Sequence, residues 1–401
     1  MTPTHVRLLV AAGLFWLLAL LSVAGGLALM RDIPESGLSS LTDRYSYSFI
    51  GWEIRNLPNK LVYKAGHLLS SGYSPQERNR VLERYFNLTD EILYLQRFGS
   101  FEDRAELERK QRERASLENK VENILEGEIT RLLEQEGLTV SPPLFDRFNF
   151  IFPPVDFELD NPPKILAISL RDTTKLIKSY QLQNEIDIST VERLEAEAEK
   201  TGVSALVLNI GGVATYPSVV PELGSLRATV NAAIHEWVHQ YLALFPLGSS
   251  YFASSESRTI NETVANIAGD ELTRLLLRRY PLAQMPANES SVNTGLNLSR
   301  EIRELRLEVE ELLARGQVEQ AEQLMEAKRQ FFLSNGIYFR KINQAYFAFR
   351  GFYADDPDSI DPIGPKLKEL RERSASLSEF MRAVSRITNS SELDQALLAS
   401  R

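Results

Sequence analysis

The chain has 401 residues, of which 43% are hydrophobic, so it holds enough apolar material for a sizeable core and for more than one lobe. It contains no cysteine, which excludes disulfides, zinc sites built from cysteine and thiol catalysis. The net charge of -9 and the pI near 5.3 argue against nucleic acid as a partner, because phosphate binding needs a dense basic surface.

An uncharged apolar run covers residues 8–30. As a helix that rises about 1.5 Å per residue, it is long enough to cross a hydrocarbon core of about 30 Å. A cleaved signal peptide has a shorter apolar region of about 7–15 residues, so the length favours an uncleaved signal anchor over a cleaved signal or a buried helix. The flanking charges weakly favour a cytoplasmic N-terminus. We therefore expect a single-pass protein of the cell membrane, with the bulk of the chain outside the cytoplasm.

Helical periodicity follows a polar linker at 31–45 and continues from about residue 47 to 138. This pattern predicts an all-helical first lobe at 31–140. Its last part, residues 101–137, is densely charged with both signs at helical spacing, which is typical of a solvated helical hairpin. A coiled coil that binds a partner is the alternative.

Proline pairs end this helical pattern, and strands follow. Short apolar runs at 164–170 and 205–210 predict two strands. Between the two strands, Ser189 is expected to cap a helix that runs to about residue 200, with Glu192 completing a capping box.

The second strand is expected to resume at 213–216, after a glycine pair, and to be followed at 226–245 by a mostly buried helix. Another helix is predicted from residue 257 or 259 to 279. The later segments are a polar loop at 281–299, an αα-hairpin at 299–315 and 317–334, an aromatic-rich segment at 337–352, and closing helices at 366–386 and 390–399.

Together these elements predict an α+β fold that is predominantly α-helical. The expected divisions are a transmembrane segment at 1–30, the helical lobe at 31–140, a core with a small sheet and two helices at 141–290, and a C-terminal helical subdomain at 291–401 that completes a cleft. The two core helices carry the residues from which a function can be argued.

The run His235-Glu236-Trp237-Val238-His239 spells HExxH within the first of these helices. A helix turns by about 100° per residue, so both imidazoles project from one face, one turn apart, and can bind the same metal ion. Glu236 then lies beside the metal as a candidate base. The alternative is a pair of histidines packed on a half-buried helix without a metal.

A catalytic zinc ion generally has three protein ligands and one open position. The remaining histidines, His5 and His67, lie ahead of the apolar run and in the helical lobe. A carboxylate is therefore the expected third ligand. Glu262 lies on the next predicted helix, which can return antiparallel to the first and direct its carboxylate at the same ion. The rival ligands are Glu256, Asp270 and Glu271.

Asn266 lies one helical turn beyond Glu262, on the same face of the helix. Its side-chain carbonyl is expected to accept the free imidazole N–H of a liganding histidine, which fixes the tautomer of that ligand. The alternative for both side chains is an ordinary solvated position on a helix.

The chain resembles the gluzincins, metallopeptidases that combine HExxH with a downstream glutamate. The downstream element reads NExxxD in thermolysin-like enzymes and ExxAD in some membrane zinc peptidases. Residues 261–266 read NETVAN and differ in having Asn266 in place of the aspartate. The resemblance implies a zincin-like catalytic domain in which Zn2+ is held by His235, His239 and Glu262, with Glu236 as the base.

A second likeness concerns residues 342–346 and 351–353, which are similar to the N-N-A…Y segment of a group of bacterial aminopeptidases with HExxH. Gluzincins commonly place a tyrosine or histidine where it stabilises the oxyanion. The likeness implies that Tyr353, and after it Tyr346, has this role. An aromatic cluster in the core between helices is the alternative.

The segment ahead of the HExxH helix is expected to align a substrate chain by strand addition. Thermolysin-like aminopeptidases often carry a Gly-x-Met-Glu-Asn segment there, whose glutamate binds the substrate amine. Residues 212–216 contain no glutamate, so recognition of an amine has no support from this segment.

The predicted function is that of a membrane-anchored, zinc-dependent metallopeptidase whose catalytic domain lies outside the cytoplasm and whose substrate is a peptide or protein. Zinc activates a water molecule for attack on the peptide bond, and Glu236 acts as general base. Two alternatives remain open. One is a zinc hydrolase of a non-peptide amide or ester, and the other is a non-enzymatic membrane scaffold with a structural or vestigial metal site.

Overall fold

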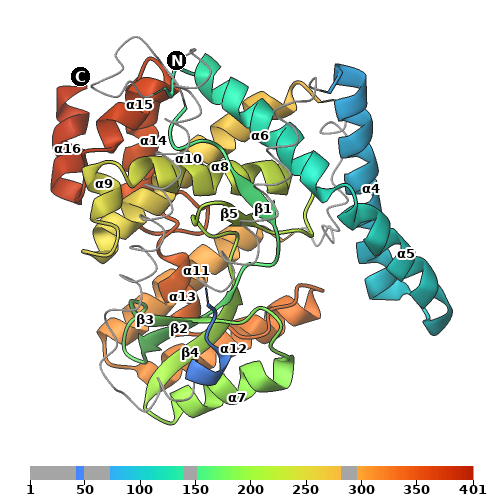
Figure 1. The fold of residues 1–401 in the computed structure, drawn as a ribbon. Helices are drawn as coiled ribbons and strands as arrows, with labels where there is room; N and C mark the ends of the chain where they lie inside the picture. The colour runs from blue at the N-terminus through green and yellow to red at the C-terminus, as the bar shows by residue number, and fades with distance from the viewer. Residues whose placement is uncertain (1–41, 49–72, 140–150, 281–295, 401) are drawn as a thin grey trace.

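The computed structural model describes residues 42–48, 73–139, 151–280 and 296–400. In these ranges the fold is α+β and mostly helical, with two small sheets, as the sequence predicts. Figure 1 shows two tiers: a helical tier that contains α6, α8, α10 and α14–α16, and a second tier that contains the larger sheet with α7 and α11–α13.

None of the helices in the described ranges has the length and apolarity of a membrane span. The candidate span at 8–30 lies outside the described residues, so the expected anchor stays a prediction.

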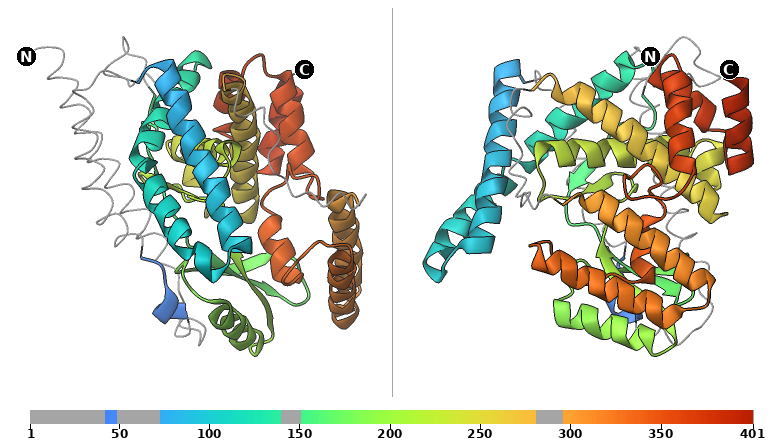
Figure 2. Two further views of the ribbon diagram at one scale, coloured as in Figure 1. Left: turned by 90° about the vertical axis from the view of Figure 1, so that its right-hand side faces the viewer. Right: turned by 180° about the vertical axis from the view of Figure 1, so that it is seen from behind.

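The first helices form a long pair. α4 (Pro75–Phe98) begins with Ser74, whose hydroxyl accepts the backbone N–H of Glu77, and α5 (Arg104–Ala115) packs against it after the short turn η2 (Phe101–Asp103). The free end of this pair projects from the body of the protein in Figures 1 and 2. Within the predicted solvated segment at 101–137, α5 is largely exposed, but its partner α4 precedes that segment.

The next helix, α6 (Glu118–Gln135), differs from that prediction because it buries one face, including several carboxylates. Glu122 accepts the backbone N–H of Leu159 at 2.8 Å, and Glu126 accepts that of Phe157 at 3.2 Å. Both donors belong to β1 (Phe157–Leu159), which pairs in parallel with β5 (Ser218–Val220). The buried acids of α6 thus satisfy backbone groups of a short strand, which removes the cost of burying them unpaired.

The larger sheet has the strand order β3-β2-β4 and is antiparallel throughout. β2 (Lys164–Leu170) and β4 (Val203–Asn209) match the predicted strands, whereas β3 (Leu176–Leu182) was not predicted. Side chains alternate between the two faces of β2. Leu166 packs toward α7 (Ile188–Glu199), and Ala167 packs toward α13 (Gln344–Arg350).

The N-cap of α7 differs from the prediction. Asp187, rather than Ser189, caps the helix by accepting the backbone N–H of Thr190 at 2.9 Å, and the Ser189 hydroxyl donates to the same carboxylate at 2.5 Å. A carboxylate two residues earlier in the chain therefore takes the capping position, and Glu192 is not part of a capping box.

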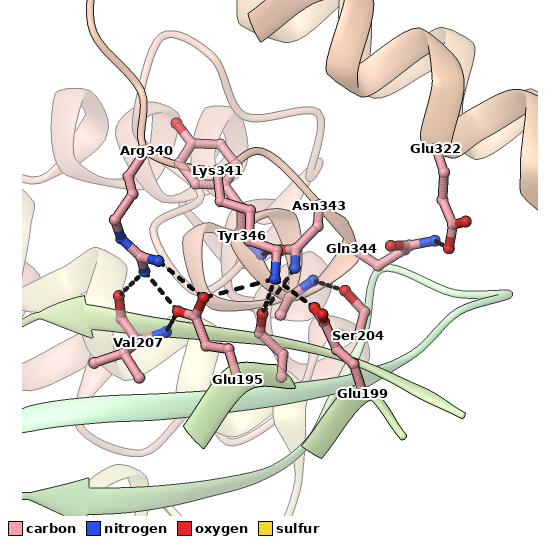
Figure 3. Close-up of polar contacts among 12 residues, drawn as sticks. Glu195, Glu199, Ser204, Val207, Glu322, Arg340, Lys341, Asn343, Gln344 and Tyr346 are labelled. Atoms are coloured by element: carbon pink, nitrogen blue, oxygen red, sulfur yellow. Dashed lines mark hydrogen bonds and ion pairs between the residues drawn. The ribbon is translucent and has the colours of Figure 1, made fainter. Parts of the chain in front are cut away.

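Figure 3 shows polar contacts that join the segment before α13 to the sheet. The Arg340 guanidinium donates to the buried Glu195 carboxylate of α7 and to the backbone carbonyl of Val207 in β4. Asn343 donates to the carbonyl of Ala205 at 2.9 Å and also caps α13. This seam holds α13, and the residues that follow it, beside the sheet.

The core helices carry the HExxH motif and the candidate third ligand. α8 (Leu226–Leu242) packs on α10 (Ser255–Leu277) in the most extensive helix–helix contact among the described residues. The other helices are the short α9 (Pro246–Ser249), the predicted hairpin α11 (Leu298–Ala314) and α12 (Val318–Ser334), and the closing helices α14 (Ile363–Arg373), α15 (Leu377–Val384) and α16 (Ser390–Ala399); a short turn, η1 (Asp43–Tyr45), lies near the start.

The largest hydrophobic core runs through α4, α6, α8 and α10 and continues into α14, α15 and α16. It therefore crosses the expected divisions near residues 140 and 290, and those divisions stay predictions. The consequence for the site is that α8 and α10 are fixed from several sides by buried apolar contacts.

Candidate metal centre

Helix α8 exposes its two histidines on one face because the opposite face is bound into the core. Ser225 caps the helix by accepting the backbone N–H of Ala228 at 3.2 Å. Trp237, which is 1% exposed, packs in the core and donates its indole N–H to the carbonyl of Pro153 at 2.8 Å. With Trp237 facing inward, the side chains of His235 and His239 face the other way, toward a cavity.

Helix α10 runs antiparallel to α8. Asn231, near the start of α8, donates to Asp270 late in α10 at 2.9 Å, whereas His239, near the end of α8, contacts Asn261 early in α10. This arrangement places Glu262 opposite both histidines, as the sequence predicts for a helix that returns along the first.

The three predicted ligand atoms converge. Nε2 of His235 and Nε2 of His239 lie 2.9 Å apart, and each lies 3.4 Å from Oε2 of Glu262. Zinc bonds of about 2.0–2.1 Å in a tetrahedron separate two ligand atoms by about 3.3 Å. The two nitrogens and one oxygen are therefore spaced as ligands of a single ion, and these residues could hold a metal.

The three rival carboxylates do not join this group. Asp270 accepts from Asn231, and Glu271 pairs with Arg371 at 2.7 Å. Glu256 lies in the first turn of α10, about 1.7 turns before Glu262. Of the candidates, only Glu262 belongs to the His–His–Glu group found among the described residues.

Tyr251 orients the glutamate. Its hydroxyl donates to Oε1 of Glu262, the oxygen that does not face the histidines. This contact leaves Oε2 free to point between the two imidazoles. Tyr251 was not predicted from the sequence, because it lies in a serine-rich connection between α9 and α10 without a recognisable motif.

The amide beside the histidine also differs from the prediction. Oδ1 of Asn261 lies 2.6 Å from Nδ1 of His239, so Asn261 is the residue that accepts the imidazole N–H when Nε2 binds a metal. The amide of Asn266 instead donates to Asp355 at 3.1 Å. The position that was expected for Asn266, beside a histidine that can bind a metal, is therefore occupied by Asn261 of the same motif.

Burial and charge act on the titration of these groups. Burial lowers the pKa of His239, but Glu262, Glu236 and Asn261 together outweigh it and raise the pKa to about 9. Burial raises the pKa of Glu262, but His239 and His235 lower it well below its usual value. The ionised carboxylate is the form that binds a cation, and the protonated imidazole must release its proton to do so.

Glu236, which is 6% exposed, lies next to the group, and burial raises the pKa of its carboxyl. Gly212, in the connection after β4, packs directly on this side chain. A Cβ atom at position 212 would lie 2.4 Å from Oε1 of Glu236, closer than any real contact. The glycine thus leaves the space in which the carboxylate sits.

One cavity of about 970 Å³ is bordered by the three candidate ligands and by the side chains that contact them or lie beside them: His235, Glu236, His239, Tyr251, Asn261 and Glu262. Its walls come from α8 and α10, from the connection at 210–216, and from β2, β3 and the end of β4 in the larger sheet. Gln240 of α8 donates to the hydroxyl of Ser218 at 2.9 Å, which holds the end of that connection against α8. The cavity is large enough for several residues of an extended peptide.

The two predicted tyrosines have different places. Tyr353 borders the cavity, and burial, followed by the Glu262 and Glu236 carboxylates, raises the pKa of its hydroxyl well above the usual value. Tyr346 is not among the described residues that line the cavity; its ring lies 6.0 Å from that of Phe339 and 5.3 Å from that of Phe347, within a hydrophobic cluster. Tyr346 therefore matches the alternative of an aromatic core residue.

Comparison of the chain with family models, curated proteins and solved structures gave no match. The case for a function therefore depends on the residues themselves and on the geometry around His235, His239 and Glu262.

Proposed function

We propose that the chain is a zinc-dependent hydrolase that cleaves peptide bonds, with His235, His239 and Glu262 as the metal ligands. The observation that carries the proposal is the convergence of three ligand atoms, 2.9–3.4 Å apart, at the wall of a cavity that also contains the buried Glu236 carboxylate. A metal ion that only joined the two helices would need no buried acid beside it. A hydrolase, by contrast, uses a general base next to the metal.

The donor set favours zinc. Two imidazole nitrogens and one carboxylate oxygen form a mixed set that suits zinc better than magnesium or calcium, which prefer oxygen ligands. Three protein ligands leave one coordination position open, which is typical of a catalytic site, whereas a structural zinc site generally has four. The cavity beside the ligands gives a substrate access to that position.

A bound zinc ion supplies Lewis acidity, which makes water a nucleophile at neutral pH and polarises a carbonyl group. Glu236 accepts the proton of the attacking water and delivers it to the leaving nitrogen, so that the carboxylate is regenerated. Its burial and its contact with Gly212 fix its position beside the metal ligands. Tyr251 and Asn261 hold two of the ligands in orientation.

Tyr353 is the proposed donor to the oxyanion. Its hydroxyl borders the same cavity as Glu236 and is protonated at neutral pH, and a protonated phenol can donate a hydrogen bond to a developing negative charge. The second predicted candidate, Tyr346, is not part of this proposal.

The proposal also keeps the expected membrane anchor at 8–30, which is supported by the length of the uncharged run alone. Full-length protein that sediments with membranes and resists extraction by carbonate would support it. Release of the protein by carbonate would count against it.

The direct test uses full-length protein in detergent, with zinc content measured by atomic absorption and hydrolysis measured on a mixture of fluorogenic peptides. We expect about one zinc per chain. Replacement Glu236→Gln should abolish hydrolysis and retain the zinc, whereas His239→Ala should lose both. Folded protein that binds no zinc would overturn the proposal. Cleavage of esters but of no peptide would favour a hydrolase of non-peptide substrates.

A further inference from the structure

We propose that Arg258 makes this cavity selective for substrates that carry a carboxylate near the bond to be cleaved. The inference rests on the proposed hydrolase function and adds its substrate class. It is carried by one arginine on the cavity wall whose charge has no counterion among the described residues.

Arg258 lies on α10 one turn before Glu262 and borders the cavity. Its guanidinium is stacked on two aromatic rings, at 4.0 Å from the ring centre of Phe352 and 5.3 Å from that of Tyr251. Tyr251 is the residue that orients Glu262. The guanidinium is therefore held beside the metal ligands by rigid rings rather than left free in solvent.

Within the described part of the chain, the guanidinium of Arg258 has no partner of opposite charge. Among the described residues no carboxylate lies within 4.0 Å of it, and its Nε is buried without a hydrogen-bond acceptor. The other arginine on the cavity wall, Arg350, is paired with Asp356 at 2.7 Å and with Asp358 at 3.2 Å. The two arginines thus differ in the one property that decides whether a site attracts an anion.

The pairs of opposite charge around the cavity do not include Arg258. A divalent cation at the three ligands faces the Glu262 and Glu236 carboxylates, and Arg350 faces two aspartates of its own. Arginine presents a planar fork of donors that matches a carboxylate in two parallel hydrogen bonds. A carboxylate of the substrate is therefore the group that satisfies this site.

Two groups of a peptide have this chemistry: the C-terminal carboxylate, and the side chain of aspartate or glutamate. The first makes the enzyme a carboxypeptidase, and the second makes it an endopeptidase with a preference for acidic residues. An N-terminal ammonium group would be repelled by the guanidinium, and residues 212–216 offer no acid to bind it.

The test compares one peptide sequence in three forms: with a free C-terminus, with an amidated C-terminus, and amidated with a glutamate in place of a glutamine near the scissile bond. We expect the wild-type protein to prefer one carboxylate form over the neutral form by about 10- to 100-fold in kcat/KM. Arg258→Gln should remove this preference, so that the variant cleaves its carboxylate and neutral forms with equal kcat/KM. Which carboxylate form is preferred distinguishes the two sources.

Arg274→Gln is the matched control, because Arg274 is exposed on the same helix and is not among the described residues that line the cavity. It removes the same charge and should keep the full preference. Arg258→Lys keeps the charge but lacks the planar fork, and it should keep only part of the preference. Equal cleavage of all three forms by the wild type, or an unchanged preference in Arg258→Gln, would overturn the inference.

A binding measurement separates this inference from the proposed function. Zinc-loaded protein with Glu236→Gln should bind the carboxylate form of the peptide about tenfold or more tightly than the neutral form in calorimetry. Adding Arg258→Gln should abolish that difference. Selective binding without turnover in the wild type would overturn the hydrolase and retain the carboxylate site, whereas turnover without selectivity would do the reverse.

Discussion

Gly212 touches the side chain of Glu236, and its replacement by alanine tests the role assigned to that carboxylate. The added Cβ would lie 2.4 Å from Oε1 and 2.9 Å from Cδ and Cγ of Glu236, whereas ordinary contacts begin near 3.4 Å. The carboxylate must therefore move by about 1 Å to restore a normal separation. Because it borders the cavity, it can move into that space while the fold is retained.

A displacement of about 1 Å in a catalytic group lowers the rate by on the order of 100-fold. We expect Gly212→Ala to lose about that factor in kcat/KM on the fluorogenic peptides. The zinc content should stay unchanged, because the three nearest atoms to the added Cβ all belong to Glu236 and none to a ligand. Metal analysis and kinetics on the same preparation give both quantities.

Gly211→Ala is the matched control for the neighbouring position. A Cβ atom at position 211 would meet nothing within 4 Å, and neither glycine has a positive φ that would strain an alanine. Equal kcat/KM in the two variants, with zinc present in both, would refute the assignment of Glu236 as the base. Loss of zinc in Gly212→Ala would show that the contact supports the ligands instead.

Three other predictions concern metal affinity, stability and pH. Asn261→Ala should weaken zinc binding by about 10- to 100-fold in a competition assay with a chelator, and Asn266→Ala should leave it unchanged. Arg340→Ala should lower the free energy of unfolding in urea by about 2–3 kcal/mol, because it takes a partner from the buried Glu195. Burial raises the pKa of Glu118 to about 7 from 4.5, so the unfolded state releases its proton first and stability falls as pH rises between these values. Glu118→Gln should remove that fall and leave the free energy of unfolding below pH 4.5 unchanged. Above pH 7 the variant should therefore be more stable than the wild type, by at most about 3 kcal/mol in thermal unfolding.

The sequence predicts the strands of the larger sheet only where both faces are buried. β2 and β4 are continuous apolar runs, because α7 covers one face of the sheet and α13 the other. β3 pairs with β2 alone among the described strands and alternates with lysine, serine and glutamine, so its apolar signal is weak. An edge strand of this composition is recognised only when its partner is known.

The charge of α6 was a misleading signal for a related reason. Mixed charges at helical spacing favour a solvated helix, which is correct for α5. In α6 the acids Glu122 and Glu126 point inward and bind backbone N–H groups of β1. The need for those acids arises from a strand distant in the sequence, and no local pattern reveals it.

In the candidate site, too, the sequence reveals the features that are local and not those that depend on contacts between distant segments. The HExxH spacing places two histidines on one face of any helix, so their convergence is a local property of the sequence. The amide that supports His239 depends on the direction of the second helix. Since α10 runs antiparallel to α8, the end of α8 meets the start of α10, and Asn261 reaches the imidazole. Asn266 lies about 7.5 Å farther along the helix axis and meets Asp355 instead.

The parts of the site that the sequence does not reveal come from connections rather than from α8 and α10. Gly212 follows β4, and Tyr251 precedes α10, yet each fixes one carboxylate on a helix by direct contact. The helices set the spacing of the ligands, and the connections set the direction in which Glu236 and Glu262 point. Changes in the connection that touches Glu236 should therefore alter turnover without altering metal content, whereas changes in the groups that hold the ligands should alter metal affinity first.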